Sequence, residues 1–245
     1  MKRSFLALAL LAVLCLNLAG CCPPRVATLT VSQVPWPDEE MTSYVIEDQQ
    51  GNEVGNAEII IAKEGETYVL TSAIIVSEAT DEIIIRMKAD DLKPISENRT
   101  LYIPPGRIIA EGIWQLNASY NASQLTLETE TPMVQKEPYT VDVPEDAFAY
   151  DQVLCLLRTL PYKEDYTASY TNIIIWPNLE MPTATVTVTS RETVEAPAGS
   201  FDCHKLEVSL ENVALKYYFW YGVNEPHYLI KYDNGFSIFL LTEHP

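Results

Sequence analysis

The sequence predicts a mainly β fold, a large and extended antiparallel sheet with one short packed helix. Two observations support this prediction. Runs rich in β-branched and aromatic residues recur from about residue 40 onward, and turn-forming residues separate them. In one of these runs, residues 183–188, threonine alternates with an apolar residue, which is typical of a strand with one face in water.

The expected elements follow in chain order. Residues 21–37 are rich in proline and are expected to form a tether that leads into a single β-rich domain, residues 38–245. Gly51 marks the first turn, and residues 117–121 are expected to form a hairpin loop. The expected strands are residues 42–47, 54–62, 67–76, 82–87, 108–116, 123–129, 166–176, 183–194, 201–210, 213–221, 228–232 and 236–241.

One segment has helical rather than β spacing. After Tyr150, apolar residues recur at Val153, Leu154, Leu157 and Leu160. Acidic residues suit the start of this segment, and Pro161 ends it. The spacing predicts an amphipathic helix of about three turns, with its apolar face packed on the sheet.

Three runs of isoleucine, residues 59–61, 83–85 and 173–175, lose the alternation of the other strands. Strands that are apolar on both faces need something to cover the second face. The helix would cover part of it. The rest would be ordinary core, another sheet, or a curled barrel wall around a ligand cavity. In the last case Ile60, Ile84 and Ile174 are candidate ligand-contacting residues.

Trp220 is a fourth candidate ligand contact. It lies in the densest aromatic run of the chain, Tyr217 to Tyr221. Such a run either packs across neighbouring strands or offers a platform for a sugar or a lipid.

The first residues of the chain resemble a bacterial lipoprotein signal. Lys2 and Arg3 precede an apolar stretch that is too short to span a membrane, and Leu18-Ala19-Gly20-Cys21 resembles a lipobox. Residues 1–20 are therefore predicted to be a signal peptide, with cleavage before Cys21 and diacylglycerol on its sulfur. The alternative is an uncleaved transmembrane anchor.

Location and partners follow from this prediction and from the charge. The whole chain has a net charge of −18, and cleavage would remove two basic residues, which leaves −20. Such a chain repels nucleic acid. The expected location is extracytoplasmic, held to the bacterial membrane by the lipid: the outer membrane of a diderm host, or the outer face of the plasma membrane of a monoderm one.

The remaining cysteines and histidines suggest little chemistry. Cys155 and Cys203 are a candidate disulfide pair, since the predicted compartment permits oxidation. Cys203 and His204 are neighbours on a strand and point to opposite faces, which disfavours a catalytic dyad. No spacing typical of a zinc or calcium site occurs. We expect no catalytic activity, no metal, and no cofactor beyond the diacylglycerol on Cys21.

Two longer stretches carry a family resemblance. The segments VEAPAGSFDCHKLEVSL, residues 194–210, and YFWYGVNEPHYLIKY, residues 218–232, resemble hairpins of exported bacterial proteins of the domain-of-unknown-function 3108 family. Residues 54–57 and 158–161 resemble further parts of it. The resemblance implies a partly curled, half-barrel-like antiparallel sheet in the cell envelope, and nothing definite about activity. The lipid anchor departs from the many soluble members.

Two functions therefore stay open. The first is an envelope lipoprotein that binds an apolar or amphipathic molecule, such as a lipid, in its curled sheet. The second is a structural or assembly factor that presents its acidic surface to another envelope protein.

Overall fold

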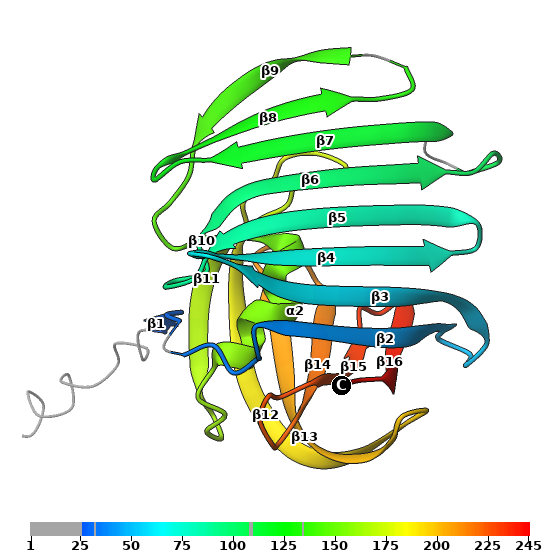
Figure 1. Cartoon of the computed structure of the whole chain (residues 1–245), viewed down its shortest axis with the longest axis vertical. Helices are drawn as coiled ribbons and strands as arrows, with labels where there is room; N and C mark the ends of the chain where they lie inside the picture. Colours follow the sequence, from blue (N-terminus) through cyan, green and yellow to red (C-terminus); the bar gives the residue numbers. More distant parts are fainter. Residues whose placement is uncertain (1–25, 32, 108–109, 134) are drawn as a thin grey trace, which may run out of the picture.

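The computed structural model describes residues 26–245 except 32, 108–109 and 134. Its strands form one 16-stranded sheet that curls around a short helical segment (Figure 1). The mainly β, curled fold predicted from the sequence is therefore confirmed. The predicted signal peptide and Cys21 lie outside the described residues.

The front half of the sheet is an antiparallel series of eight strands in chain order. They are β2 (Glu39–Asp48), β3 (Glu53–Glu64), β4 (Thr67–Val76), β5 (Ala79–Lys88), β6 (Pro94–Ile103), β7 (Gly112–Tyr120), β8 (Gln124–Glu130) and β9 (Gln135–Asp142). Strand β5 shows the alternation clearly: Ile83, Ile85 and Met87 are buried, and the residues between them are exposed.

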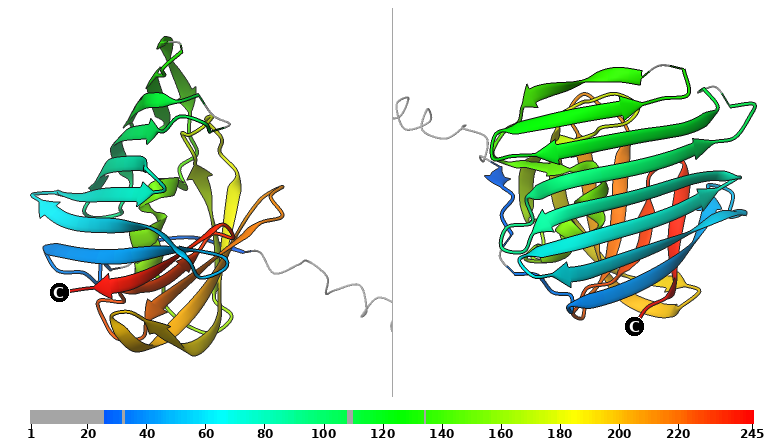
Figure 2. Two further views of the ribbon diagram at one scale, coloured as in Figure 1. Left: turned by 90° about the vertical axis from the view of Figure 1, so that its right-hand side faces the viewer. Right: turned by 45° about the horizontal axis from the view of Figure 1, so that its top comes forward.

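The rear half continues the same sheet, because β16 pairs with β2. Its antiparallel strands are β11 (Thr167–Ile173), β12 (Thr183–Ala196), β13 (Gly199–Leu210), β14 (Lys216–Gly222), β15 (Leu229–Asp233) and β16 (Ser237–Glu243). The short strands β1 (Ala27–Thr28) and β10 (Ala147–Ala149) pair in parallel with β11. Figure 2 shows the two halves facing each other.

The helical segment, residues 150–159, lies between the two halves (Figure 1). It consists of the 3₁₀ turn η1 (Tyr150–Gln152), the α-helix α2 (Val153–Leu156) and the 3₁₀ turn η2 (Leu157–Thr159). The predicted helix therefore exists, but only its middle turn is α-helical. It ends before Pro161, as the sequence predicts, because proline at that position cannot continue the hydrogen-bond ladder.

The predicted hairpin loop at residues 117–121 has the wrong bounds, and four strands, β1, β6, β9 and β10, were not predicted. Residues 117–120 belong to β7, and the turn lies at residues 121–123. There the Asn121 side chain accepts hydrogen bonds from the backbone N–H groups of Ser123 and Gln124 and so forms the turn itself. Strands β6 and β9 are rich in charged and polar residues, which hides their period in the sequence.

Two of the isoleucine runs, residues 59–61 and 83–85, turn their middle residue to the outer face of the sheet. Ile59 and Ile61 are buried, as are Ile83 and Ile85, but Ile84 between them is 41% exposed. Ile60 likewise lies on the outer face of β3 and is half-buried. The expectation of a covered second face is therefore wrong for Ile84, because the strand keeps the ordinary alternation with an apolar residue on its solvent face.

Candidate functional site

The concave face of the sheet is filled by the helical segment. Leu156 and Leu157 are fully buried, and Val153 and Leu160 nearly so. The hydroxyl of Tyr221, on β14, donates to the carbonyl oxygen of Leu154 at 3.0 Å. At the other end of the segment, Gln152 donates from Nε2 to the carbonyl of Leu92, 2.8 Å away. These contacts fix the segment to both halves of the sheet.

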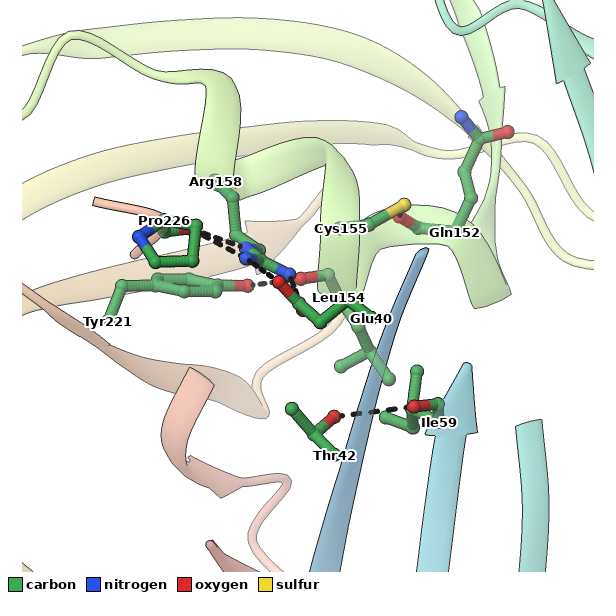
Figure 3. A network of polar contacts seen from close by, with 9 residues as sticks. All are labelled: Glu40, Thr42, Ile59, Gln152, Leu154, Cys155, Arg158, Tyr221 and Pro226. Carbon is green, nitrogen blue, oxygen red and sulfur yellow. Dashed lines mark hydrogen bonds and ion pairs between the residues drawn. The ribbon is translucent and has the colours of Figure 1, made fainter. Parts of the chain in front are cut away.

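A buried ion pair holds the last turn of the segment (Figure 3). Arg158, on η2, donates from Nη1 and Nη2 to the two carboxylate oxygens of Glu40, on β2, at 2.6 and 3.0 Å. Both side chains are almost fully buried. Arg158 also donates from Nε and Nη2 to the carbonyl oxygen of Pro226, at 3.0 and 2.6 Å. This bidentate geometry satisfies a charge pair that would otherwise be costly to bury.

Little space remains around this pair. The space lined by Glu40, Tyr44, Ile59, Leu154 and Arg158 has a volume of about 10 Å³. That is roughly the space one water molecule occupies, far below what an acyl chain needs. The ring centres of Trp36 and Tyr228 lie 5.2 and 5.6 Å from the guanidinium carbon of Arg158. This network therefore stabilises the fold.

A second polar cluster lies near the first turn of the segment. Arg99, on β6, donates from Nε and Nη2 to the two carboxylate oxygens of Asp81, on β5, at 2.9 and 2.5 Å. Its Nη1 lies 3.4 Å from Asp151, on η1. Glu97 of β6 is 1% exposed and accepts a hydrogen bond from the Tyr120 hydroxyl at 3.0 Å. Burial, and next the charge of Asp151, raise the pKa of Glu97 well above its usual range.

Only a faint sequence signal marks these two clusters. Arg158 interrupts an apolar helical run, which could have marked a charge facing the core. Its partner Glu40 is 118 residues away in the sequence. Arg99 and Asp151 are likewise 52 residues apart, so their contact depends on the way the sheet curls.

The four candidate ligand contacts do not meet at one site. Ile60 on β3 and Ile84 on β5 lie on the outer face of the front half, with β4 between them. Ile174 follows β11, bridges to Glu180 through its backbone and packs partly buried against the core. Trp220 is 5% exposed, and its ring lies between Lys205 and Lys231, with their Nζ atoms 4.9 and 4.7 Å from the ring centre.

The candidate disulfide between Cys155 and Cys203 is not formed. Both cysteines are buried and free. The Cys155 thiol donates to the carbonyl of Gln152 at 3.0 Å, within the helical segment. The Cys203 thiol contacts the carbonyl of Phe201, in its own strand. Each thiol therefore behaves as a small buried group with a local partner, and burial raises the pKa of both to about 12.

The outer face of the front half carries side chains in ordered rows. The strand register places Glu58, Glu82 and Glu130 in one row across β3 to β8, with small and polar residues between them. All three carboxylates are exposed. None of the ion pairs found between described residues involves them. We call these three residues the acidic row.

Apolar side chains flank the acidic row on both sides. Met41, Ile60 and Ile84 form the first apolar row, and Ile75, Tyr102 and Ile113 form the second. All but Ile60 are between 39% and 56% exposed. Because side chains on one face of a strand repeat every two residues, each apolar row lies about 7 Å from the acidic row. The outer face therefore combines exposed apolar groups with unpaired negative charge.

Comparison with known proteins supports the fold alone. No family model matches the chain, and no curated protein does. The resemblance to the domain-of-unknown-function 3108 family thus stays a prediction. A β-barrel-like protein of the domain of unknown function DUF1849 from Brucella abortus has a TM-score of 0.56 at 10% identity. The match covers 84% of this chain and 96% of that protein.

Two further solved structures resemble the chain more weakly. One is a candidate exported protein with a YmcC-like fold from Bacteroides fragilis, with a TM-score of 0.35, 10% identity and coverage of 89% and 99%. The other is a candidate lipoprotein from Parabacteroides distasonis, with a TM-score of 0.30, 12% identity and coverage of 86% and 97%. None of the three neighbours is named as an enzyme.

Neither a membrane-spanning helix nor a metal-binding cluster is present in the described part of the chain. Residues 26–245, with their gaps, contain no helix of sufficient length and apolarity to cross a membrane. They also contain no group of three or more histidine, cysteine or acidic side chains arranged to hold a metal ion.

Proposed function

We propose that this chain is a lipid-anchored protein of the cell envelope, without catalytic activity, that binds a protein partner through the outer face of the front half. The observation that carries this proposal is the acidic row between two exposed apolar rows. Apolar groups at this exposure are usual where proteins bind partners, and the unpaired carboxylates favour a partner segment that carries lysine or arginine.

The alternative, a lipid or another apolar molecule held in the curled sheet, has less support. The concave face is occupied by the helical segment, and the space beside Arg158 is about 10 Å³. The charge of the chain also disfavours nucleic acid as a partner. We therefore favour the assembly role over the carrier role.

Membrane attachment is tested by replacing Cys21 with alanine. We expect the wild-type protein to enter the detergent phase of a two-phase extraction, and Cys21→Ala to stay unprocessed or to move to the aqueous phase. The reason is that two or three acyl chains anchor a protein stably, whereas the acidic body alone would be repelled by anionic headgroups. Equal detergent partitioning of both forms would contradict the lipid anchor.

The partner site is tested by photo-crosslinking in cells that make the full-length protein. A photoreactive phenylalanine analogue at Ile84 or Tyr102 is expected to give a discrete crosslinked protein. The same analogue at Phe236, which is 74% exposed in the β15–β16 turn, serves as the control and should give none. Reversing the charge with Glu58→Lys and Glu82→Lys should abolish the crosslink, since the favourable charge pairing is lost.

Two results would overturn the proposal. One is equal crosslinking from Phe236, which would indicate random encounters. The other is the absence of an outer-face product, together with saturable binding of a fluorescent fatty acid to the purified protein, which would restore the carrier role.

A further inference from the structure

The polar cluster beneath the first turn of the helical segment holds more acidic groups than one cation can neutralise. Asp81, Glu97 and Asp151 face a single guanidinium, that of Arg99. Arg99 is already committed to Asp81 through two hydrogen bonds and to Asp151 through a longer contact. Glu97 thus has no cation of its own.

Glu97 is also the most deeply buried of the three acids. Its side chain lies on β6 at 1% exposure, whereas the side chains of Asp81 and Asp151 are 16% and 14% exposed. An isolated ionised carboxylate in such a place is very unfavourable, and the usual result is that the group keeps its proton. A protonated Glu97 could donate a hydrogen bond to a neighbouring carboxylate, and Asp151 is the neighbour whose charge, after burial, does most to raise the pKa of Glu97.

We propose that Glu97 is a proton-dependent contact between the sheet and the helical segment. When protonated, it donates a hydrogen bond to Asp151 and accepts one from Tyr120, so that β6, β7 and η1 are joined. When it loses the proton, two buried carboxylates face each other and the attachment of the first turn of the segment to the sheet weakens. The last turn stays in place, because Arg158 still binds Glu40.

The groups that face this pair come from every neighbouring element. They are Asp81 on β5, Arg99 on β6, Tyr120 on β7, Tyr150 on η1 and Tyr232 on β15. The four groups other than Arg99 are acids, and burial raises the pKa of Asp81, Tyr120, Tyr150 and Tyr232 as well. Arg99 is therefore the one cation in this described set, and nothing else in the set can offset a second negative charge at Glu97.

The sign of the pH effect follows from this arrangement. The folded state binds the Glu97 proton more tightly than the unfolded chain does. The contact therefore contributes its full stability below the ordinary pKa of glutamic acid. This stability is lost as the pH rises toward and through the raised pKa of the folded state. The first turn is thus held firmly in acid and loosened in alkali.

The test measures hydrogen–deuterium exchange of residues 150–156 in the intact protein between about pH 5 and about pH 10, corrected for the intrinsic pH dependence of exchange. As the pH rises from the ordinary pKa of glutamic acid toward the raised pKa of Glu97, we expect protection of the first turn to fall by up to about tenfold per pH unit. Residues 157–160 should change less. Glu97→Gln, which keeps a donor toward Asp151 and cannot ionise, should remove the fall. Glu128→Gln, at an exposed position of β8, should leave it unchanged.

A direct readout keeps the proposal testable if the variant fails to fold. The ¹³C chemical shift of the Glu97 carboxyl in the wild-type protein reports its ionisation. A shift typical of a protonated acid at neutral pH is expected. A carboxylate shift at about pH 5, near the ordinary value for glutamic acid, would overturn the proposal. So would a fall in protection that is equal in wild type and Glu97→Gln.

Discussion

Replacing Arg158 with methionine is expected to lower the free energy of unfolding by about 3–5 kcal/mol, because it leaves the Glu40 carboxylate buried without a cation. The variant also removes both donors from the Pro226 carbonyl. Urea denaturation followed by tryptophan fluorescence measures the loss, since Trp36 lies 5.2 Å from the guanidinium.

Two controls separate the buried pair from an ordinary ion pair. Arg86→Met removes a pair with Glu64 whose side chains are 45% and 57% exposed, and it should cost less than about 1 kcal/mol. The double variant Arg158→Met/Glu40→Met should recover most of the stability, because no unpaired charge is left in the core. A loss from Arg158→Met no larger than that from Arg86→Met would show that the network contributes little.

The second large effect is expected at Gly55, where replacement by alanine should cost about 2–3 kcal/mol. Gly55 pairs with Val76 of β4, next to a register shift between β2 and β3. A Cβ atom at this position would lie 1.9 Å from the carbonyl oxygen of Ile75, which is backbone and cannot rotate away. Strands β3 and β4 would have to separate locally.

Gly222→Ala is the matched control, because an added Cβ there has its nearest neighbour at an ordinary 3.8 Å. It should change the unfolding free energy by less than about 1 kcal/mol. Thermal and urea unfolding of both variants measure the difference. A Gly55→Ala protein as stable as Gly222→Ala would mean that the close approach of the two strands relaxes at little cost.

The sequence by itself determined the fold class and the place of the helix. Strand periodicity in β2 to β5 and β11 to β16 is strong because one face of each strand is apolar, and burial then follows from alternation. Pro161 set the end of the helical segment for a local reason, since its ring and missing N–H act on the turn that precedes it. Local features of this kind can be recognised in the sequence without knowing which strand pairs with the segment.

Strand β6 shows where the local signal fails. Its inward positions include Glu97 and Arg99, which break the apolar alternation of the segment. These polar residues are tolerated because Asp81, Tyr120 and Asp151 come from other elements to satisfy them. The sequence pattern of a strand cannot reveal partners that only the curl of the sheet supplies.

Only the tertiary structure decided which surfaces are free. The isoleucine runs suggested a covered second face or a cavity, yet Ile84 is exposed and the concave side is filled by the helical segment. The acidic row exists only because the register of six strands aligns Glu58, Glu82 and Glu130, and register depends on pairing across the whole sheet. Arg158 and Glu40 meet for the same reason: the curl that joins β16 to β2 brings the helical segment over β2.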